Sequence, residues 1–373
     1  MKLLIAIDSY KGSLSSADAG AAAREGVLRG CPGAEVIALP IADGGEGTAD
    51  AIAHAKGGQL AECRAHDPLG REIISSYGIA GDTAIIEMAK ASGLELLKKE
   101  EYNPLITSTR GTGELILSAI DAGCREFILG IGGSATNDGG MGMAKALGAK
   151  FLDDEGNELG EGGAELLRLD KIDISSMDGR LCDCRFRVAC DVTNPLYGEN
   201  GASRVFGPQK GASAEDVELL DKALHRYGNI LERDVCPSIA SRLGAGAAGG
   251  LGAAFMAFLK GTPEKGAELV LEAVGIDALL HGCDAVITGE GRTDFQTVFG
   301  KAPIEVARHA SNHNIPCYII SGSLGRGYEK VLSHGVTACF SITDGPMELK
   351  EAMENAPRLL SSAAEMLARV IAK

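Results

Sequence analysis

A short apolar run that breaks into glycines, hydroxyls and an Asn-Asp pair occupies residues 127–140. The pattern predicts a strand, a glycine-rich loop and a helix that begins at Met141. Glycine lacks a Cβ, so backbone N–H groups in such a loop can approach an anion closely, and a helix start adds partial positive charge. The stretch therefore predicts a phosphate-sized loop, although glycine-rich turns also join strands to helices for purely geometric reasons.

The same order of strand, polar glycine-rich loop and helix recurs along the chain, at residues 43–48, 289–294 and 321–325. Strands that alternate with helices are typical of a parallel sheet, whose ligands bind beyond the carboxyl ends of the strands. We therefore expect a five-stranded doubly wound sheet with its polar loops at one edge. Its strands are predicted near residues 2–7, 35–39, 285–287, 317–320 and 337–342.

The middle of the chain follows a different pattern. Residues 59–66, 71–79 and 84–88 are short, more polar runs separated by turn residues, which indicates antiparallel hairpins. We predict two α/β domains. Residues 1–57 and 282–373 form a flavodoxin-like doubly wound domain, and residues 58–281 form an inserted mixed-sheet domain, with an active-site cleft between the two.

Composition narrows the class of protein. A chain of 373 residues usually builds two hydrophobic cores, and 51 glycines with 4% aromatic residues are typical of α/β enzymes with tight turns. The 36 basic and 51 acidic residues give a net charge of −15, which disfavours nucleic acid and anionic membranes as partners. No apolar run approaches the ~20 residues of a membrane span, and the apolar start is too short for a signal peptide, so we expect a cytoplasmic protein.

The predicted loops combine glycines, carboxylates, hydroxyls and a few cations, among them Lys11, Arg292 and Lys301. Phosphoryl transfer depends on this mixture, because it proceeds by positioning and charge neutralisation. A nicotinamide enzyme would carry Gly-x-Gly-x-x-Gly after its first strand, where residues 8–13 stand instead. Structural alternatives stay open: Asp43 can be a helix-start acid, and Asp191 can form a turn with the Asn-Pro that follows.

Seven stretches carry a resemblance. They are DSYKGSLS (8–15), ADGGEGT (42–48), DPLG (67–70), GGSATNDGG (132–140), CDVTNPL (190–196), FGPQKG (206–211) and GEGRTD (289–294), the last followed by GKAP (300–303). As an ordered set that spans nearly the whole chain, they resemble the motifs of the bacterial glycerate kinase family. Tyr10 stands where that family usually has Phe, which adds one hydroxyl beside the predicted site.

The resemblance implies ATP- and Mg²⁺-dependent phosphorylation of D-glycerate to 2-phosphoglycerate. It also implies a flavodoxin-like domain with an inserted restriction-endonuclease-like domain, in a monomer or homodimer. Three alternatives remain: the same scaffold could give 3-phosphoglycerate, act on another small hydroxy acid, or serve as a non-enzymatic sensor that binds an anion.

The resemblance also assigns roles to residues. Asp191 is the first choice for the base that takes the glycerate hydroxyl proton, with Asp43 as its rival. Lys11 and Arg292, with Ser9 beside them, are expected to neutralise the phosphoryl group or hold the glycerate carboxylate. Glu290 or Asp294 is expected to hold Mg²⁺. The residues expected to line the nucleotide phosphates are Gly44, Gly45, Gly132, Gly133, Ser134 and Asn137.

Overall fold

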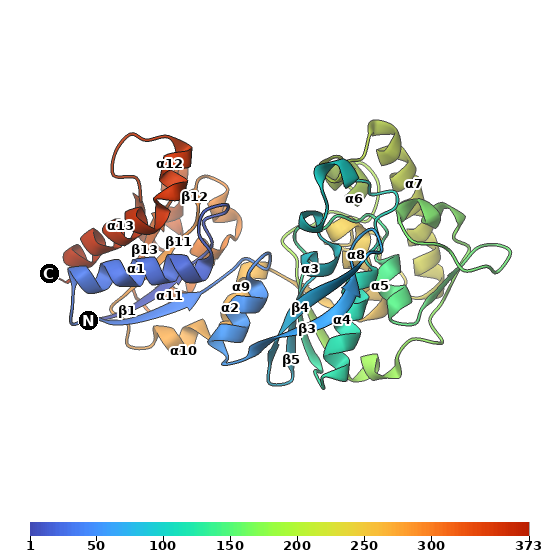
Figure 1. Ribbon diagram of the computed structural model, residues 1–373, viewed down its shortest axis with the longest axis horizontal. Coiled ribbons are helices and arrows are strands. Elements are labelled where there is room, and N and C mark those ends of the chain that lie inside the picture. The colour runs from blue at the N-terminus through green and yellow to red at the C-terminus, as the bar shows by residue number, and fades with distance from the viewer. Residues whose placement is uncertain (373) are drawn as a thin grey trace. The chain divides into compact units, whose positions relative to one another are not determined.

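The structure is a computed structural model that describes residues 1–372 (Figure 1). The chain forms two compact units, which are described here one at a time. The first unit comprises residues 1–43, 50–57 and 267–373, and the second comprises residues 44–49 and 58–266. Within residues 1–372, no helix combines the length and the apolar character that a membrane span requires.

The first unit contains a five-stranded sheet in which every strand pair is parallel. The strand order is β15-β13-β11-β1-β2, which confirms the predicted doubly wound sheet. Chain order reverses between β1 and β11, so the topological switch point lies between these two strands. The strands are β1 (Lys2–Ile7), β2 (Glu35–Pro40), β11 (Ala285–Gly289), β13 (Cys317–Ser321) and β15 (Val336–Ser341).

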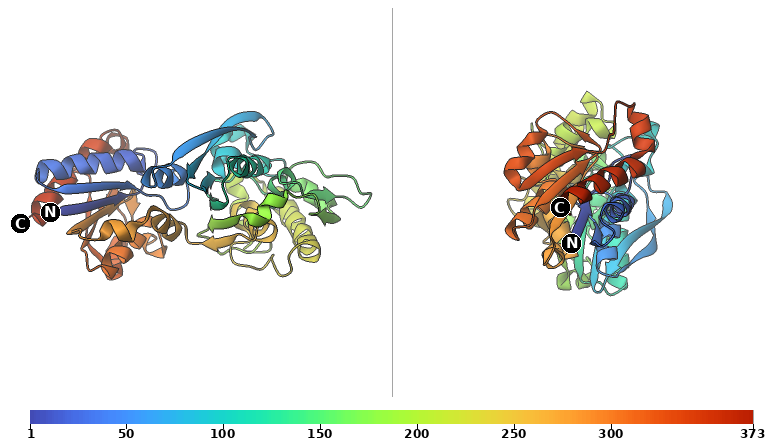
Figure 2. Two further views of the ribbon diagram at one scale, coloured as in Figure 1. Left: turned by 90° about the horizontal axis from the view of Figure 1, so that it is seen from below. Right: turned by 90° about the vertical axis from the view of Figure 1, so that its left-hand side faces the viewer.

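Helices α1 (Ser16–Gly30) and α13 (Ala356–Ile371) pack against each other and against this sheet (Figures 1 and 2). Alternate β1 residues, Leu3, Ile5 and Ile7, belong to their shared apolar core, as the period of a strand requires. The remaining elements of this unit include α11 (Ala302–Asn312), which contacts β11 and β13. The others are α2 (Thr48–Ala55), α9 (Gly266–Val274), α10 (Ile276–Leu280), β12 (Arg292–Thr293), β14 (Ser323–Leu324) and α12 (Leu349–Glu354), with 3-10 helices at Thr297–Phe299 and Tyr328–His334.

The second unit is built on a six-stranded mixed sheet with the order β10-β9-β6-β5-β4-β3. The three strands β3 (Gln59–His66), β4 (Glu72–Ala80) and β5 (Thr83–Glu87) are antiparallel neighbours, which confirms the predicted hairpins. From β5 onward the pairing is parallel, so one edge gathers the carboxyl ends of four strands. The parallel partners are β6 (Glu126–Gly130), β9 (Arg185–Ala189) and β10 (Thr262–Glu264).

The helices of the second unit bury a separate apolar core that includes Leu115, Phe127, Phe151, Tyr227 and Phe255. The principal helices are α4 (Arg110–Asp121), α5 (Met141–Ala146), α7 (Ala214–Asp234) and α8 (Ala247–Phe258). Short elements complete the unit: α3 (Ala89–Ser92), β7 (Lys150–Leu152), β8 (Lys171–Asp173), α6 (Ala202–Phe206), and 3-10 helices at Leu94–Leu96, Lys99–Glu101, Gly163–Arg168, Gly179–Asp183 and Pro208–Lys210.

Helices α9 and α10 lie with the first unit, whereas the sequence pattern placed residues up to 281 in the inserted domain. Their side chains explain this placement, because they pair with α11. His309 and His313 of α11 both contact the Asp277 carboxylate, at 2.9 and 3.1 Å, and Arg308 lies 3.0 Å from Glu268. Contacts of this kind leave no signal in a local sequence pattern.

Candidate functional site

Charged side chains gather at the carboxyl edge of the parallel sheet in the first unit. Asp8 follows β1 and Glu290 follows β11, and the backbone N–H of Asp8 donates to the Gly289 carbonyl at 3.0 Å. Asp43 follows β2 and acts electrostatically on Asp8. The carboxylates therefore meet at the topological switch point, where α/β sheets bind their ligands.

Among the carboxyl groups at this edge, Asp8 is the one whose pKa is clearly changed by its surroundings. Burial and the neighbouring charge of Asp43 raise the pKa of Asp8 to about 7 from its ordinary 3.8. The Ser9 N–H, which donates to Asp8 Oδ1 at 2.6 Å, and the charge of Lys301 act in the opposite direction. A carboxyl with a pKa near neutrality can exchange a proton at working pH, which is the property of a general acid or base.

Glu290 is held by several groups, in contrast to Asp8. Its Oε1 accepts from the hydroxyls of Thr293 at 3.1 Å and Thr297 at 2.7 Å, and its Oε2 lies 3.0 Å from Lys301 Nζ. Asp294 accepts from the Gln296 N–H at 2.9 Å and lies 3.3 Å from the Nε of Arg292. The oxygens expected to hold Mg²⁺ are thus engaged within the protein.

A direct metal site is not formed by these residues. Within residues 1–372, no cluster of three His, Cys, Asp or Glu side chains has an arrangement that could hold a metal ion. Magnesium in kinase sites is commonly held by one or two carboxylates together with the substrate phosphates. Protein donors already contact the carboxylates of Glu290 and Asp294, and a place for either as such a ligand stays a prediction.

The loop after β1 presents Lys11 to solvent, and Gly12 takes a φ of +76° at its turn. Arg292 is also exposed, at 65% of its side chain. Tyr10 does not present its hydroxyl to the site, contrary to the expectation from the sequence. Its ring is buried, and its hydroxyl donates to the Ile320 carbonyl at 2.7 Å, so it stabilises the neighbouring strand instead.

The glycine-rich loop of the second unit follows β6, as predicted, and exposes Gly132 and Gly133. Leu94 N–H donates to the Gly133 carbonyl, and Ala135 N–H donates to the Ser92 carbonyl, so the loop is anchored on both sides. Among the described residues, the N–H groups of Gly132, Gly133 and Ser134 have no acceptor. A run of open N–H groups is the arrangement that binds anions.

The start of helix α5 is closed to an anion, contrary to the expectation from sequence. The buried Asp138 carboxylate accepts from Gly140 N–H and Gly142 N–H, both at 3.1 Å, and also from the N–H and hydroxyl of Thr109. An Asp within the loop thus takes the helix N–H groups that a phosphate would have used. An anion that binds this loop must therefore be held by the N–H groups of Gly132, Gly133 and Ser134.

The predicted phosphate-lining glycines lie together in the second unit. A Cβ at Gly132 would come within 3.5 Å of Gly45 Cα, and one at Gly130 within 2.5 Å of the Gly44 carbonyl oxygen. Gly44 in turn packs against Ala189 and Gly266, and the Gly266 N–H donates to Asp191 Oδ1 at 2.9 Å. Two glycine pairs and Asp191 therefore share the carboxyl edge of the mixed sheet.

Asn137 lies within the protein rather than at the loop surface. It is fully buried, and its Nδ2 donates to Ser203 Oγ at 2.9 Å. Lys210 is also buried within the second unit, and its role could not be predicted from the sequence. Its place in the FGPQKG stretch was the only available signal, since a buried lysine cannot be distinguished from a surface one by its neighbours in sequence. Asp8 ends the first strand, where an acid near Lys11 is more often functional than structural, but no particular role was predicted for it.

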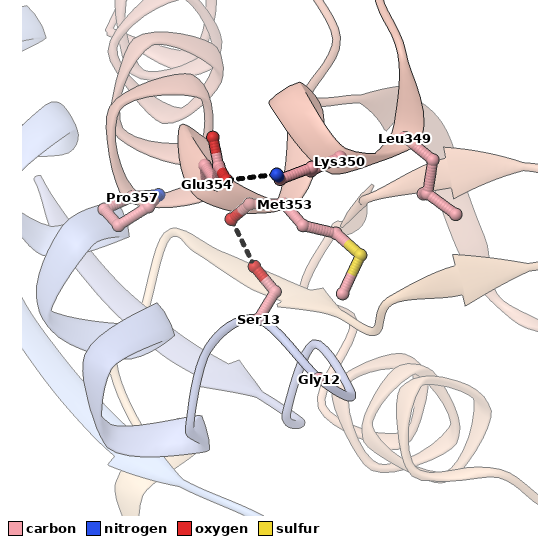
Figure 3. A pocket seen from close by; sticks show the side chains of 7 residues that line it. All are labelled: Gly12, Ser13, Leu349, Lys350, Met353, Glu354 and Pro357. Carbon is pink, nitrogen blue, oxygen red and sulfur yellow. Dashed lines mark hydrogen bonds and ion pairs between the residues drawn. The ribbon is translucent and has the colours of Figure 1, made fainter.

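A separate hollow of about 710 Å³ lies in the first unit beside the loop after β1 (Figure 3). Ser13 donates to the Met353 carbonyl at 2.8 Å across its floor, and Lys350 lies 3.9 Å from Glu354. None of the predicted site residues lines it; its lining is Gly12, Ser13, Leu349, Lys350, Met353, Glu354 and Pro357.

Comparisons with known proteins identify the family of this chain. The model of the glycerate kinase family matches residues 3–372. A glycerate kinase of Halalkalibacterium halodurans is 48% identical, over 99% of this chain and 97% of the relative. The glycerate 2-kinase of Escherichia coli K12 is also 48% identical, over 100% of this chain and 98% of the relative.

A solved structure agrees as well. The crystal structure of a protein described as a glycerate kinase 2 from Salmonella typhimurium LT2 matches with a TM-score of 0.90 at 46% identity, and covers 100% of this chain and 98% of that one. The fold class inferred from the sequence is thereby confirmed. The relatives are named as enzymes, which removes the alternative of a non-enzymatic sensor. The chain belongs to the glycerate kinase family and is an enzyme of that family.

Proposed function

We propose that this enzyme transfers the terminal phosphoryl group of ATP, taken up with Mg²⁺, to the 2-hydroxyl of D-glycerate. The choice of product is supported by the name of the Escherichia coli relative, glycerate 2-kinase. The observation that carries the chemistry is the Asp8 carboxyl at the end of β1, whose pKa burial and the charge of Asp43 raise to about 7. In this proposal, both substrates are small molecules and the protein is a monomer or homodimer in the cytoplasm.

Asp8 is the base in this proposal, in place of Asp191. A base is most effective when its pKa lies near the working pH, because it is then both ionised and able to hold a proton. Asp8 meets this condition, and in its ionised form it accepts the proton of the attacking hydroxyl. Asp191 already accepts the Gly266 N–H with one oxygen, which holds its carboxylate in place and suits a role in orienting glycerate.

The open N–H groups of Gly132, Gly133 and Ser134 bind the nucleotide phosphates in this proposal, and the buried Asn137 holds their loop from within. Lys11 and Arg292 are exposed cations that can neutralise the transferred phosphoryl group or the glycerate carboxylate. Mg²⁺ enters with the nucleotide, where it neutralises phosphate charge, and Glu290 or Asp294 is its candidate protein ligand.

A substrate panel tests the reaction. Purified protein is incubated with Mg·ATP and D-glycerate, tartronate or lactate, and ADP is followed with a coupled assay. We expect ADP release with D-glycerate that is lost when Mg²⁺ is chelated. Faster turnover with tartronate or lactate than with D-glycerate would contradict the proposed substrate, and full activity with a chelator present would contradict the Mg²⁺ requirement.

A further inference from the structure

Lys210 is a fully buried cation of the second unit whose partners all lie on the glycine-rich loop. Its side chain is 1% exposed, at the end of the 3-10 helix Pro208–Lys210. Nζ donates to Ser134 Oγ at 2.7 Å and to the Thr136 carbonyl at 2.6 Å. Both acceptors are neutral, so the ammonium is hydrogen-bonded but not neutralised by them.

No carboxylate makes a contact ion pair with Lys210 within the described residues. Asp138 lies near enough to act on it electrostatically, but that carboxylate is already bonded to Thr109, Gly140 and Gly142. Burial lowers the pKa of Lys210 to about 7, and Asp138 opposes this shift. A buried charge without a contact partner is costly, and such groups are commonly retained where a ligand completes them.

The direction of the hydrogen bond determines what Ser134 can do. Because Lys210 donates, Ser134 Oγ is the acceptor, and its own hydroxyl proton is left to be donated elsewhere. The backbone N–H groups of Ser134, Gly132 and Gly133 also have no acceptor among the described residues. One hydroxyl and three N–H donors are thus available at a loop with a positive charge buried beneath it.

The segment that carries Lys210 is docked firmly. Ser203, on the same segment, accepts from Asn137 of the loop at 2.9 Å. Gly211, with a φ of +95°, packs so closely on Tyr102 that a Cβ would come within 2.4 Å of its carbonyl oxygen. The Lys210 ammonium group is therefore held in a fixed position relative to the glycine-rich loop.

We infer that Lys210 is a positioning residue for nucleotide binding, which orients Ser134 and places a buried positive charge behind the phosphate oxyanion held by Gly132, Gly133 and Ser134. This inference rests on the proposed function for the identity of the anion. A glycerate carboxylate has related oxyanion chemistry, so the test must distinguish the two sources.

The test compares Lys210→Met and Ser134→Ala with the wild type and with Lys145→Met. Lys145 is the control on α5, because its Nζ also donates to two neutral oxygens, the carbonyls of Leu159 and Gly160, and lies 3.4 Å from the Glu161 carboxylate. ADP dissociation constants are measured by calorimetry, the KM values for ATP and D-glycerate by steady-state assay, and folding by thermal unfolding.

We expect Lys210→Met to weaken ADP binding and raise the KM for ATP by about tenfold or more, with the KM for D-glycerate within about twofold. Lys145→Met should lower the unfolding temperature without changing ADP affinity. Ser134→Ala should weaken ADP by several-fold, and this arm decides the question if Lys210→Met does not fold.

Unchanged ADP affinity in folded Lys210→Met, or in Ser134→Ala, would overturn the inference. A rise confined to the KM for D-glycerate would overturn it too, because the anion bound at this loop would then be the glycerate carboxylate. Failure of the proposed function is distinguishable, because wild-type protein would then bind ADP without phosphorylating D-glycerate.

Discussion

The backbone N–H of Asp8 and the carbonyl of Gly289 are joined by a hydrogen bond of 3.0 Å, so β1 and β11 end side by side. This bond places Asp8 next to Glu290, the residue after Gly289. Glu290 is paired with Lys301, whereas the only hydrogen bond to the Asp8 side chain among the described residues comes from the Ser9 N–H. Two carboxylates of similar position thus differ in their hydrogen-bond partners, and within residues 1–372 the proposed base is the one without a cation contact.

Asp8→Asn should remove the proposed base while keeping the shape of the side chain. We expect kcat to fall by about 10²- to 10⁴-fold, the usual contribution of a general base, with KM for ATP little changed. Asp284→Asn is the matched control, since Asp284 precedes β11 at the opposite edge of the same sheet. Activity of Asp8→Asn above about a tenth of wild type would contradict the assignment.

The raised pKa of Asp8 also predicts a pH-dependent stability. Between an unfolded pKa of 3.8 and a folded pKa of about 7, the folded state binds more protons, so this group contributes stability below pH 4 and that contribution is lost as pH rises to 7. Asp8→Asn should therefore unfold at a higher temperature than wild type at pH 8, with a gain on the order of 2–3 kcal/mol, and similarly to wild type at pH 4. Equal gains at both pH values would contradict the shift.

The neighbours of Asp8 should move its titration in opposite directions. The charge of Asp43 raises the pKa of Asp8 and that of Lys301 lowers it. When kcat/KM of the Asp43→Asn variant is measured against pH, the acidic limb of the profile should shift to lower pH. In Lys301→Met it should shift to higher pH. Shifts in the same direction, or no shift in either variant, would show that another group controls this limb.

Gly249→Ala should destabilise the second unit severely. Gly249 has a φ of +71°, and a Cβ there would lie 2.0 Å from the carbonyl oxygen of Thr136, the same oxygen that accepts from Lys210. Gly156→Ala is the control, because Gly156 has a φ of +84° with open space around it. By calorimetry we expect a loss of about 1 kcal/mol for Gly156→Ala and more than about 4 kcal/mol for Gly249→Ala. Similar losses would mean that the loop can move aside.

The sequence predicted the elements that have a strong local pattern. The alternation of apolar strands and amphipathic helices indicated the parallel sheet, and the turn residues of 67–70 and 81–82 indicated the hairpins. It also placed Gly44, Gly45, Gly132 and Gly133 in one group, and the two loops that carry them approach each other at Gly45 and Gly132. These features depend on periodicity and glycine spacing, which a single sequence contains.

What the sequence did not predict depends on contacts between distant segments. At the start of α8, Ala248, Gly249 and Gly250 have positive φ values, and the two glycines pack against residues 136–139. The closure of α5 by Asp138, the burial of Lys210 and the raised pKa of Asp8 likewise depend on what lies beside each residue in space. Local patterns carry no record of such neighbours.

Phosphorus NMR of the product formed from Mg·ATP and D-glycerate tests the central claim most directly, because one spectrum reports both the reaction and the position of the phosphoryl group. We predict a 2-phosphoglycerate signal that grows as ATP is converted to ADP and that is absent with Asp8→Asn over the same time. A 3-phosphoglycerate signal, or no phosphoglycerate from folded wild-type protein, would contradict the account.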